Sequence, residues 1–179
     1  INKKNLGAGG SRNVGIKLAT GKYICFIDAD DIWMKNKLKI QIDFMIEKNI
    51  SCSHTSYVVI DINGRAQGIR KARDYKDYFE LQKSCNIGLS TVIIERNLLK
   101  KKFRFPTIKT KEDFVLWLKL VKSGHPIIGI KKNLAKWRKS NNSLSSSFFQ
   151  KIKDGFKVYN YYLNYSIFKS FYYLIILSI

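Results

Sequence analysis

Four residues, Asp28-Ala29-Asp30-Asp31, directly follow the apolar run Tyr23–Ile27, and this junction constrains the fold more than any other feature of the chain. The short unbroken run predicts a strand buried on both faces, as in a parallel sheet. Ligands of such sheets bind beyond the carboxyl ends of the strands. Clustered carboxylates there are costly to desolvate unless they are compensated, and a hard divalent cation that also contacts phosphates suits them. The alternative interpretation is an acidic turn that caps the next helix.

Length and composition indicate one domain with an anionic partner. The 179 residues suffice for a sizeable core, and the 45% apolar content argues against disorder. The net charge of +20 predicts binding to nucleic acid, to an acidic membrane surface or to a phosphate-bearing substrate. Three widely spaced cysteines, Cys25, Cys52 and Cys85, indicate reduced thiols in a cytosolic setting, not a disulfide framework or a zinc site.

Apolar spacing and capping residues predict three main helices. The first begins at an N-cap Ser11 and ends before Gly21, and the glycines that precede it are interpreted as packing positions first and phosphate contacts second. The second spans residues 32–48, with lysines on its outer face, and the third spans residues 111–123. The core-facing stripe of the second helix is expected to consist of Leu38, Ile42, Met45 and Ile46.

Strands are predicted between these helices. The stretch 56–62 is β-branched and aromatic, and Asn63-Gly64 supplies a tight hairpin turn after it. Residues 65–88 are polar, basic and rich in Tyr, and they predict a mobile loop with one helical turn. The remaining expectations are a strand at 90–94, a short basic helix at 96–101, strands at 126–130 and 134–137, and a polar loop at 139–147.

Residues 148–179 form a basic, aromatic tail that the sequence separates from the domain at 1–147. Its last apolar stretch, 171–177, is far shorter than the ~20 residues needed to cross a bilayer. Two interpretations are equally supported. The lysines at 151, 153, 157 and 169 beside aromatic residues suit a helix lying on an anionic membrane face, and the same pattern suits a helix packed on the domain.

Glu112-Asp113 opens the third predicted helix. Acidic residues in a first helical turn are favoured by the helix dipole, so local reasoning alone favours an ordinary charge pair. Together with the carboxylates at 28–31, however, Asp113 suits a site with a metal–phosphate clamp and a separate carboxylate that takes a proton from a hydroxyl.

The order of motifs resembles that of the family 2 glycosyltransferases across residues 5–146. The resemblance rests on the combined order and spacing of the segments, since each piece alone has low specificity. The segments are Asn5-Leu6-Gly7, Ser11 to Ile16, Ala19 to Ile24, Phe26 to Trp33, Lys37-Leu38, Lys111 to Trp117, Trp137-Arg138 and Asn142 to Ser145.

This resemblance implies the GT-A fold, a Rossmann-like α/β mixed sheet flanked by helices, and transfer of a sugar from a nucleotide-diphosphate donor with inversion at the anomeric carbon. By resemblance, Asp28 and Asp30 are the D-x-D aspartates that hold Mg²⁺ or Mn²⁺ against the donor diphosphate, with Asp31 sharing metal or ribose. Asp113 matches the base that deprotonates the acceptor hydroxyl, and Glu112 is expected to position that base or the acceptor.

Four further residues are implied as donor contacts. Arg12 and Asn13 match a segment beside the donor, although an ion pair between Arg12 and the acidic strand end is equally supported. Arg138 and Ser143 fall where the family has a loop that closes over the diphosphate, and a guanidinium suits phosphate. Many relatives carry a His in that loop, whereas here Lys139, Asn141 and Asn142 stand in its place.

We expect the first strand and helix of the fold, with the acidic residues that bind base and ribose, to precede Ile1, so that these residues alone do not catalyse transfer. The expected partners are a nucleotide-diphosphate sugar, a saccharide or lipid-linked acceptor for surface polysaccharide or glycolipid synthesis, and an anionic membrane surface. That places the protein in the cytoplasm, peripheral to the inner face of the plasma membrane. The rivals are a non-catalytic GT-A-like domain and a nucleic-acid-binding module, the latter disfavoured because acidic strand ends repel a polyanion.

Overall fold

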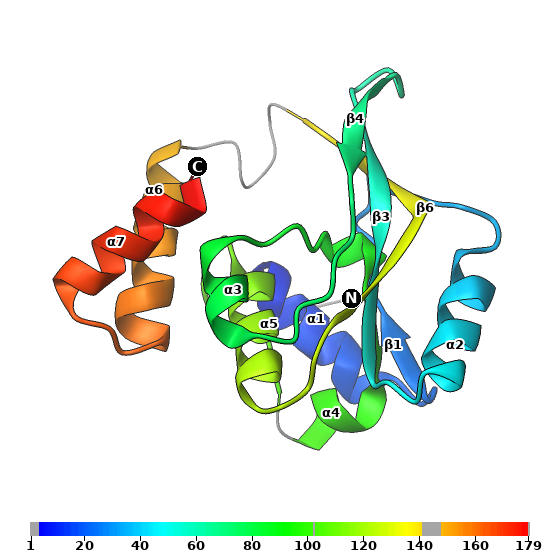
Figure 1. The fold of residues 1–179 in the computed structure, drawn as a ribbon, viewed down its shortest axis with the longest axis horizontal. Helices are drawn as coiled ribbons and strands as arrows, with labels where there is room; N and C mark the ends of the chain where they lie inside the picture. Colours follow the sequence, from blue (N-terminus) through cyan, green and yellow to red (C-terminus); the bar gives the residue numbers. More distant parts are fainter. Residues whose placement is uncertain (1–3, 102, 141–147, 179) are drawn as a thin grey trace.

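The computed structural model describes residues 4–101, 103–140 and 148–178, and its centre is one mixed sheet (Figure 1). The strands follow the order β1-β5-β3-β6-β2, and β4 pairs with β3 beside this path. Only β3 and β6 run parallel, while the other described pairs are antiparallel. The strands are β1 (Tyr23–Cys25), β2 (Ile32–Trp33), β3 (Cys52–Ile60), β4 (Ala66–Arg70), β5 (Ile93–Glu95) and β6 (Ile128–Arg138).

Helices cover both faces of this sheet, with α2 on one side and α1, α3 and α5 on the other (Figure 1). The predicted α/β class is therefore confirmed. Helix α5 lies at the centre of the core, and nearly all of its apolar side chains are buried. The helices are α1 (Gly7–Leu18), α2 (Lys37–Glu47), α3 (Tyr78–Lys83), α4 (Arg96–Lys101), α5 (Glu112–Lys122), α6 (Phe148–Lys157) and α7 (Ile167–Ser178), with short turns η1 (Leu89–Thr91) and η2 (Val158–Tyr162).

Strand β1 differs from its prediction. It is shorter than the apolar run and pairs antiparallel with β5, at the end of the strand order. Of its three residues only Ile24 is buried, and Ile27, beyond its end, is half exposed. The expectation of a parallel strand buried on both faces was wrong for this segment, because the only described partner of β1 is the antiparallel β5.

Helix α1 begins at Gly7, so Ser11 is not its N-cap. The Asn5 side chain accepts a hydrogen bond from the Gly7 amide at 2.9 Å, and the helix continues through the predicted start. Gly9 packs against the chain at Pro106, since a Cβ added there would lie 2.9 Å from the Pro106 carbonyl oxygen. This close approach supports the interpretation of the glycines as packing positions.

Helix α2 buries a different face from the predicted stripe. The segment Ile32–Trp33 leaves the helix and pairs with β6, so the helix begins only at Lys37. Within the stripe Met45 is buried, but Leu38 is 41% and Ile46 61% exposed. The residues that face the core are Lys37, Gln41 and Met45.

A polar contact chain explains why a lysine lies in this core. The ammonium of Lys37 donates to the Gln41 side-chain oxygen at 2.9 Å and lies over the Trp33 ring. The Gln41 amide in turn donates to the backbone oxygens of Ser53 and Thr91, at 3.2 and 2.9 Å. Burial lowers the pKa of Lys37 to about 8. The Lys37 ammonium and the Gln41 amide both have partners, which makes the burial of these two side chains tolerable.

The segment 65–88 contains strand β4, which the predicted loop did not include, and helix α3, which corresponds to the predicted helical turn. Strand β4 pairs with β3 across the turn at Gly64, which adopts a positive φ of 83° as a tight turn requires. The buried Tyr75 then bridges to Ile127, and Asp77 caps α3 by accepting from the amides of the helix's first turn. Similarly, the two strands expected at 126–130 and 134–137 are one strand, β6, whose pairing with β3 has two register shifts that leave residues 131, 132 and 134 without a partner on β3.

The C-terminal tail packs on the domain beside α3 and α5 (Figure 1). Tyr159 is fully buried and its hydroxyl donates to the Gln82 backbone oxygen at 2.7 Å. The Asp154 carboxylate accepts from the backbone and the hydroxyl of Thr110, at 2.9 and 2.8 Å. Of the two interpretations of the tail, packing on the domain is thus present in the structure. In the part of the chain described, no helix has the length and apolar character that crossing a bilayer requires.

Candidate active site

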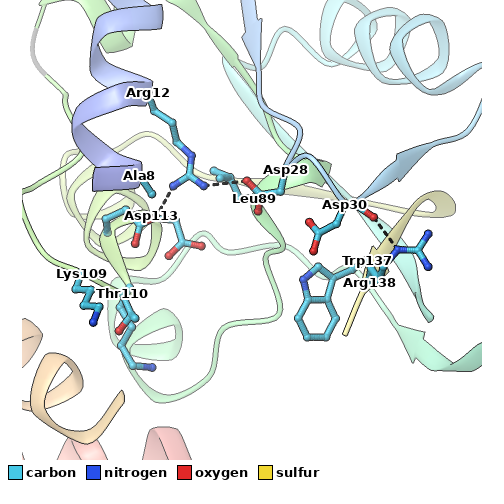
Figure 2. A pocket seen from close by; sticks show the side chains of 12 residues that line it. Ala8, Arg12, Asp28, Asp30, Leu89, Lys109, Thr110, Asp113, Trp137 and Arg138 are labelled. Atoms are coloured by element: carbon cyan, nitrogen blue, oxygen red, sulfur yellow. Dashed lines mark hydrogen bonds and ion pairs between the residues drawn. The ribbon is translucent and has the colours of Figure 1, made fainter. Parts of the chain in front are cut away.

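A cleft of about 450 Å³ lies where the end of β1, the start of α1, the start of α5 and the end of β6 converge (Figure 2). It brings Asp28 and Asp30 together with Asp113, as the resemblance implied. A smaller hollow of about 160 Å³ adjoins it and shares Asp28, Leu89, Asp113 and Trp137 with it. The cleft is lined by Ala8, Arg12, Asp28, Asp30, Leu89, Lys109, Thr110, Lys111, Glu112, Asp113, Trp137 and Arg138.

A tight turn at the end of β1 presents the first two aspartates to the cleft. The Asp31 amide donates to the Asp28 carbonyl oxygen at 3.0 Å, and the Asp28 amide donates to the Ser90 hydroxyl at 3.0 Å. Asp31 itself is buried and accepts from the Arg138 backbone amide at 2.9 Å. Burial raises the pKa of this carboxyl. Asp31 therefore joins the turn to β6, while Asp28 and Asp30 face the cleft.

The donor set at this turn fits magnesium or manganese completed by a phosphate ligand. Among the residues described, no group of three or more His, Cys, Asp or Glu side chains is arranged to hold a metal. Two carboxylates line the cleft at this point, Asp28 and Asp30. Mg²⁺ is commonly bound by one or two carboxylates, with waters and substrate phosphates supplying the other oxygens. The pair is thus suited to an ion that arrives with a diphosphate.

Arg12 joins the two acidic parts of the cleft. One guanidinium nitrogen donates to Asp28 at 2.9 Å and another contacts the Glu112 carboxylate (Figure 2). The guanidinium also lies over the Phe105 ring. Glu112 is only 8% exposed, so its charge depends on this partner. The ion pair between Arg12 and the acidic strand end, one of the two roles expected from the sequence, is present.

Asp113 occupies the first turn of α5, and the residue that directly precedes this helix has an unusual backbone conformation. Lys111 precedes the helix with a positive φ of 64°, a costly conformation for a residue with a side chain. The Asp113 carboxylate accepts from the Phe114 amide at 2.7 Å. Burial, reinforced by the neighbouring Glu112, raises the pKa of Asp113 to about 6. A carboxylate with such a pKa is suited to accept a proton near neutral pH.

Of the other three predicted donor contacts, Arg138 lines the cleft. The Arg138 guanidinium donates to the backbone oxygens of Asp30, Asp61 and Ile62, at 3.1, 3.0 and 2.9 Å. Asn13 exchanges two hydrogen bonds with the Phe105 backbone, at 2.8 and 3.0 Å, and does not line the cleft. Ser143 lies outside the described residues.

Two kinds of residue in the cleft were not anticipated. Trp137 lies near the end of β6 and lines both the cleft and the smaller hollow. Its flat ring can contact a sugar there. Lys109 and Lys111 add positive charge beside the acidic start of α5. The Trp137-Arg138 segment was a motif in the sequence, but its aromatic member gave no separate signal of a role.

Comparisons with known proteins agree with this geometry. The profile of "Glycosyl transferase family 2" matches residues 1–104. The chain is 40% identical over 148 residues to an Escherichia coli protein named UDP-Glc:alpha-D-GlcNAc-diphosphoundecaprenol beta-1,3-glucosyltransferase WfgD, covering 82% of this chain and 57% of the relative. It is 38% identical over 118 residues to the E. coli protein of the same description named WfaP, covering 66% and 46%.

Solved structures share the fold. S. aureus TarS 1–349 in complex with UDP-GlcNAc superimposes with a TM-score of 0.61 at 20% identity, over 97% of this chain and 52% of that one. A mannosyltransferase from Pyrobaculum calidifontis, in complex with GDP-Man and Mn²⁺, gives 0.63 at 13% identity, over 97% and 50%. The fold is thus GT-A, and the chain spans about half of these structures. With its acidic cleft and a family profile matched over more than half its length, the chain belongs to glycosyltransferase family 2.

Proposed function

We propose that this chain carries the catalytic centre of a metal-dependent, inverting glycosyltransferase that moves a sugar from a nucleotide-diphosphate donor to an acceptor hydroxyl. The observation that supports this most strongly is the single cleft that contains Asp28, Asp30 and Asp113, with the pKa of Asp113 raised to about 6. A carboxylate pair for a cation and a separate carboxylate for a proton are the two functions that this reaction needs.

In this proposal each group of the cleft has a separate task. Asp28 and Asp30 would hold Mg²⁺ or Mn²⁺, and the ion would supply positive charge to neutralise the departing diphosphate. Asp113 takes the proton of the acceptor hydroxyl while that oxygen attacks the anomeric carbon from the face opposite the diphosphate. The carbon–oxygen bond to the diphosphate breaks as the new glycosidic bond forms, which inverts the configuration. Arg12 holds Glu112 and Asp28 in place.

The remaining predicted residues act mainly as supports in this scheme. Asp31 and Arg138 connect the aspartate turn to β6 and to the hairpin at 61–62. Asn13 fixes α1 to the backbone at Phe105. Ser143 is retained as a donor contact on the family resemblance alone.

The acceptor is proposed to be a saccharide or glycolipid of surface polysaccharide synthesis at the inner face of the plasma membrane. The names of the two E. coli relatives, which specify a diphosphoundecaprenol-linked sugar, support this choice. Exposed aromatic residues on α6 and α7 beside lysines support a peripheral membrane contact. A nucleic-acid-binding module is disfavoured because Asp28 and Asp30 lie together beyond the end of β1, where they repel a polyanion unless a metal is bound.

The decisive variant is Asp113→Asn in the complete protein. We expect transfer to fall about 10²- to 10⁴-fold because the proton acceptor is lost. Titration with UDP and Mn²⁺ by calorimetry should give an affinity within about twofold of wild type, because Asp113 does not hold the diphosphate. The rate of transfer is measured from the amount of nucleoside diphosphate released.

Asp43→Asn is the matched control, since it removes an equal charge from an exposed ion pair on α2. Asp28→Asn together with Asp30→Asn should abolish Mn²⁺-dependent UDP binding. Turnover that survives in Asp113→Asn would disprove the assignment of the base. Donor binding that survives in the double variant would disprove the metal site. A non-catalytic domain, the rival within this fold, would bind UDP without any transfer in wild type.

A further inference from the structure

A second cleft, of about 530 Å³, lies beside the first, and the charged residues that line it are all cations. Strands β3 and β4, the segment after α3, the end of β6 and the last turn of α7 surround it. The residues that line it are Tyr57, Arg70, Lys83, Ser84, Cys85, Asn86, Trp137, Ile176 and Leu177. Its lining includes two cations and no carboxylate among the described residues, whereas the first cleft is lined by four carboxylates and four cations.

The second cleft adjoins the 160 Å³ hollow that contains the proposed base, Asp113. Tyr57 and Trp137 line both it and the 160 Å³ hollow that contains Asp113. Gly88 leaves room for the Tyr57 ring, since a Cβ added to it would lie 3.1 Å from a ring carbon. Burial raises the pKa of Tyr57 to about 12, so its hydroxyl stays protonated and can donate a hydrogen bond. A ligand in the second cleft can therefore extend across two aromatic rings toward Asp113.

The two cations of this cleft are available to an anion. Among the ion pairs of the described residues, none includes Arg70 or Lys83. A guanidinium beside an ammonium suits a phosphate group, because charge-assisted hydrogen bonds to phosphate are short and strong. The second cleft can therefore accept a diphosphate without a divalent ion.

The wall opposite these cations is apolar and continues along α7. Ile176 and Leu177 form this wall at the C-terminal end of the helix. Along the preceding turns, large apolar side chains are exposed, and Phe168 is 89% exposed. These residues are Phe168, Phe171, Tyr172 and Ile175. A helix of twelve residues is about 18 Å long, so it offers a hydrocarbon chain an extended apolar path away from the phosphate site.

We propose that the second cleft binds the diphosphate of a lipid-linked acceptor saccharide. Arg70 and Lys83 contact the phosphates, the saccharide lies against Trp137 and Tyr57 with its hydroxyl toward Asp113, and the lipid chain follows α7. This proposal rests on the proposed function, and it adds to it the place and the residues that select the acceptor. Donor and acceptor diphosphates are kept apart because only the donor's carries a divalent ion.

Binding of farnesyl diphosphate to the complete protein, in the presence of EDTA, tests this proposal. In Arg70→Gln/Lys83→Gln its affinity should fall at least about tenfold, because two charge-assisted contacts are lost. The control Arg65→Gln/Lys132→Gln removes the same charge from exposed positions outside both clefts and should leave the affinity within about twofold of wild type. Inorganic pyrophosphate should bind more weakly than farnesyl diphosphate, because it lacks the contact with α7.

Equal weakening in both double variants would overturn the proposal, since the effect would then be one of net charge. Displacement of farnesyl diphosphate by UDP with Mn²⁺ would also overturn it, because the two ligands would share one cleft. Calorimetry with UDP and Mn²⁺ on the same variants separates the two claims. If the wild-type protein does not bind UDP with Mn²⁺, the proposed function is contradicted. If Arg70→Gln/Lys83→Gln binds farnesyl diphosphate as tightly as wild type, only the proposed acceptor site is contradicted.

Discussion

At the scale of single residues, the central feature is a carboxylate that is easier to protonate than an ordinary one. Asp113 is part-buried beside Glu112, and its pKa is raised from 3.8 to about 6. The folded protein therefore binds a proton at this site at pH values where the unfolded chain has already released it. Its stability falls as the pH rises from about 4 to 6, and above that range the full cost of the charge is present.

Asp113→Asn should consequently stabilise the fold at neutral pH while removing activity. We expect the free energy of unfolding to rise by about 1–3 kcal/mol at pH 7.5, and the gain to disappear near pH 4, because the native carboxyl is then protonated. Urea denaturation at both pH values measures this difference. A gain of equal size at pH 4 would contradict the raised pKa.

At the scale of elements, the α6–α7 hairpin is connected to the start of the active-site helix. The buried Asp154 of α6 accepts from the backbone and the side chain of Thr110, which precedes Lys111 and Glu112, and also from Gln150. The hairpin therefore fixes the segment that delivers Asp113 to the cleft.

Asp154→Ala should weaken this connection. The buried Thr110 amide and hydroxyl lose their acceptor, so we expect a loss of about 2–4 kcal/mol in the free energy of unfolding. Chemical denaturation measures the loss, and Asp43→Ala, in an exposed pair on α2, should cost no more than about 0.5 kcal/mol. Similar values for the two variants would show that the hairpin does not depend on Asp154.

The elements also show what the sequence could and could not predict. Helix α5 was predictable because its apolar face and its end at Gly124 are local signals. The buried face of α2 was not, since Lys37 donates to Gln41, and Gln41 donates to Ser53 and Thr91, which only the tertiary fold brings near the helix. Strand β4 is exposed at every residue and has no apolar pattern, so only its pairing with β3 defines it.

The candidate site likewise has features that the sequence could predict and features that it could not. The cleft that joins Asp28, Asp30 and Asp113 was expected from the order of motifs. The partners of Arg138 were not, because the backbone oxygens that it contacts belong to a hairpin whose position only the tertiary fold determines. A guanidinium that is chemically suited to bind phosphate can thus donate its hydrogen bonds to backbone oxygens instead.

At the scale of the whole molecule, positive charge and exposed aromatic residues coincide on the tail. The net charge is +20, and Phe149 and Phe168 are among the most exposed apolar side chains. Lys151, Lys153 and Lys157 lie on the same helix as Phe149, and Lys169 follows Phe168. Such a surface is suited to anionic lipid.

Phe149→Ser/Phe168→Ser in the complete protein should weaken binding to phosphatidylglycerol vesicles about tenfold, because two apolar contacts with the bilayer are lost. Cosedimentation measures this binding, which should also fall with added salt. Leu18→Ser/Ile62→Ser removes equally exposed apolar groups elsewhere and should have no effect. An equal loss in both variants would contradict a specific lipid-facing surface.

The contacts of Arg12 have a consequence for how the first cleft is assembled. One guanidinium bridges α1, the aspartate turn and α5, so the chain itself supplies a positive counterpart for the carboxylates. In the proposed site, a divalent ion at Asp28 would compete with the Arg12 guanidinium for the same carboxylate. A donor diphosphate that brings its own ion would therefore have the advantage over the ion alone.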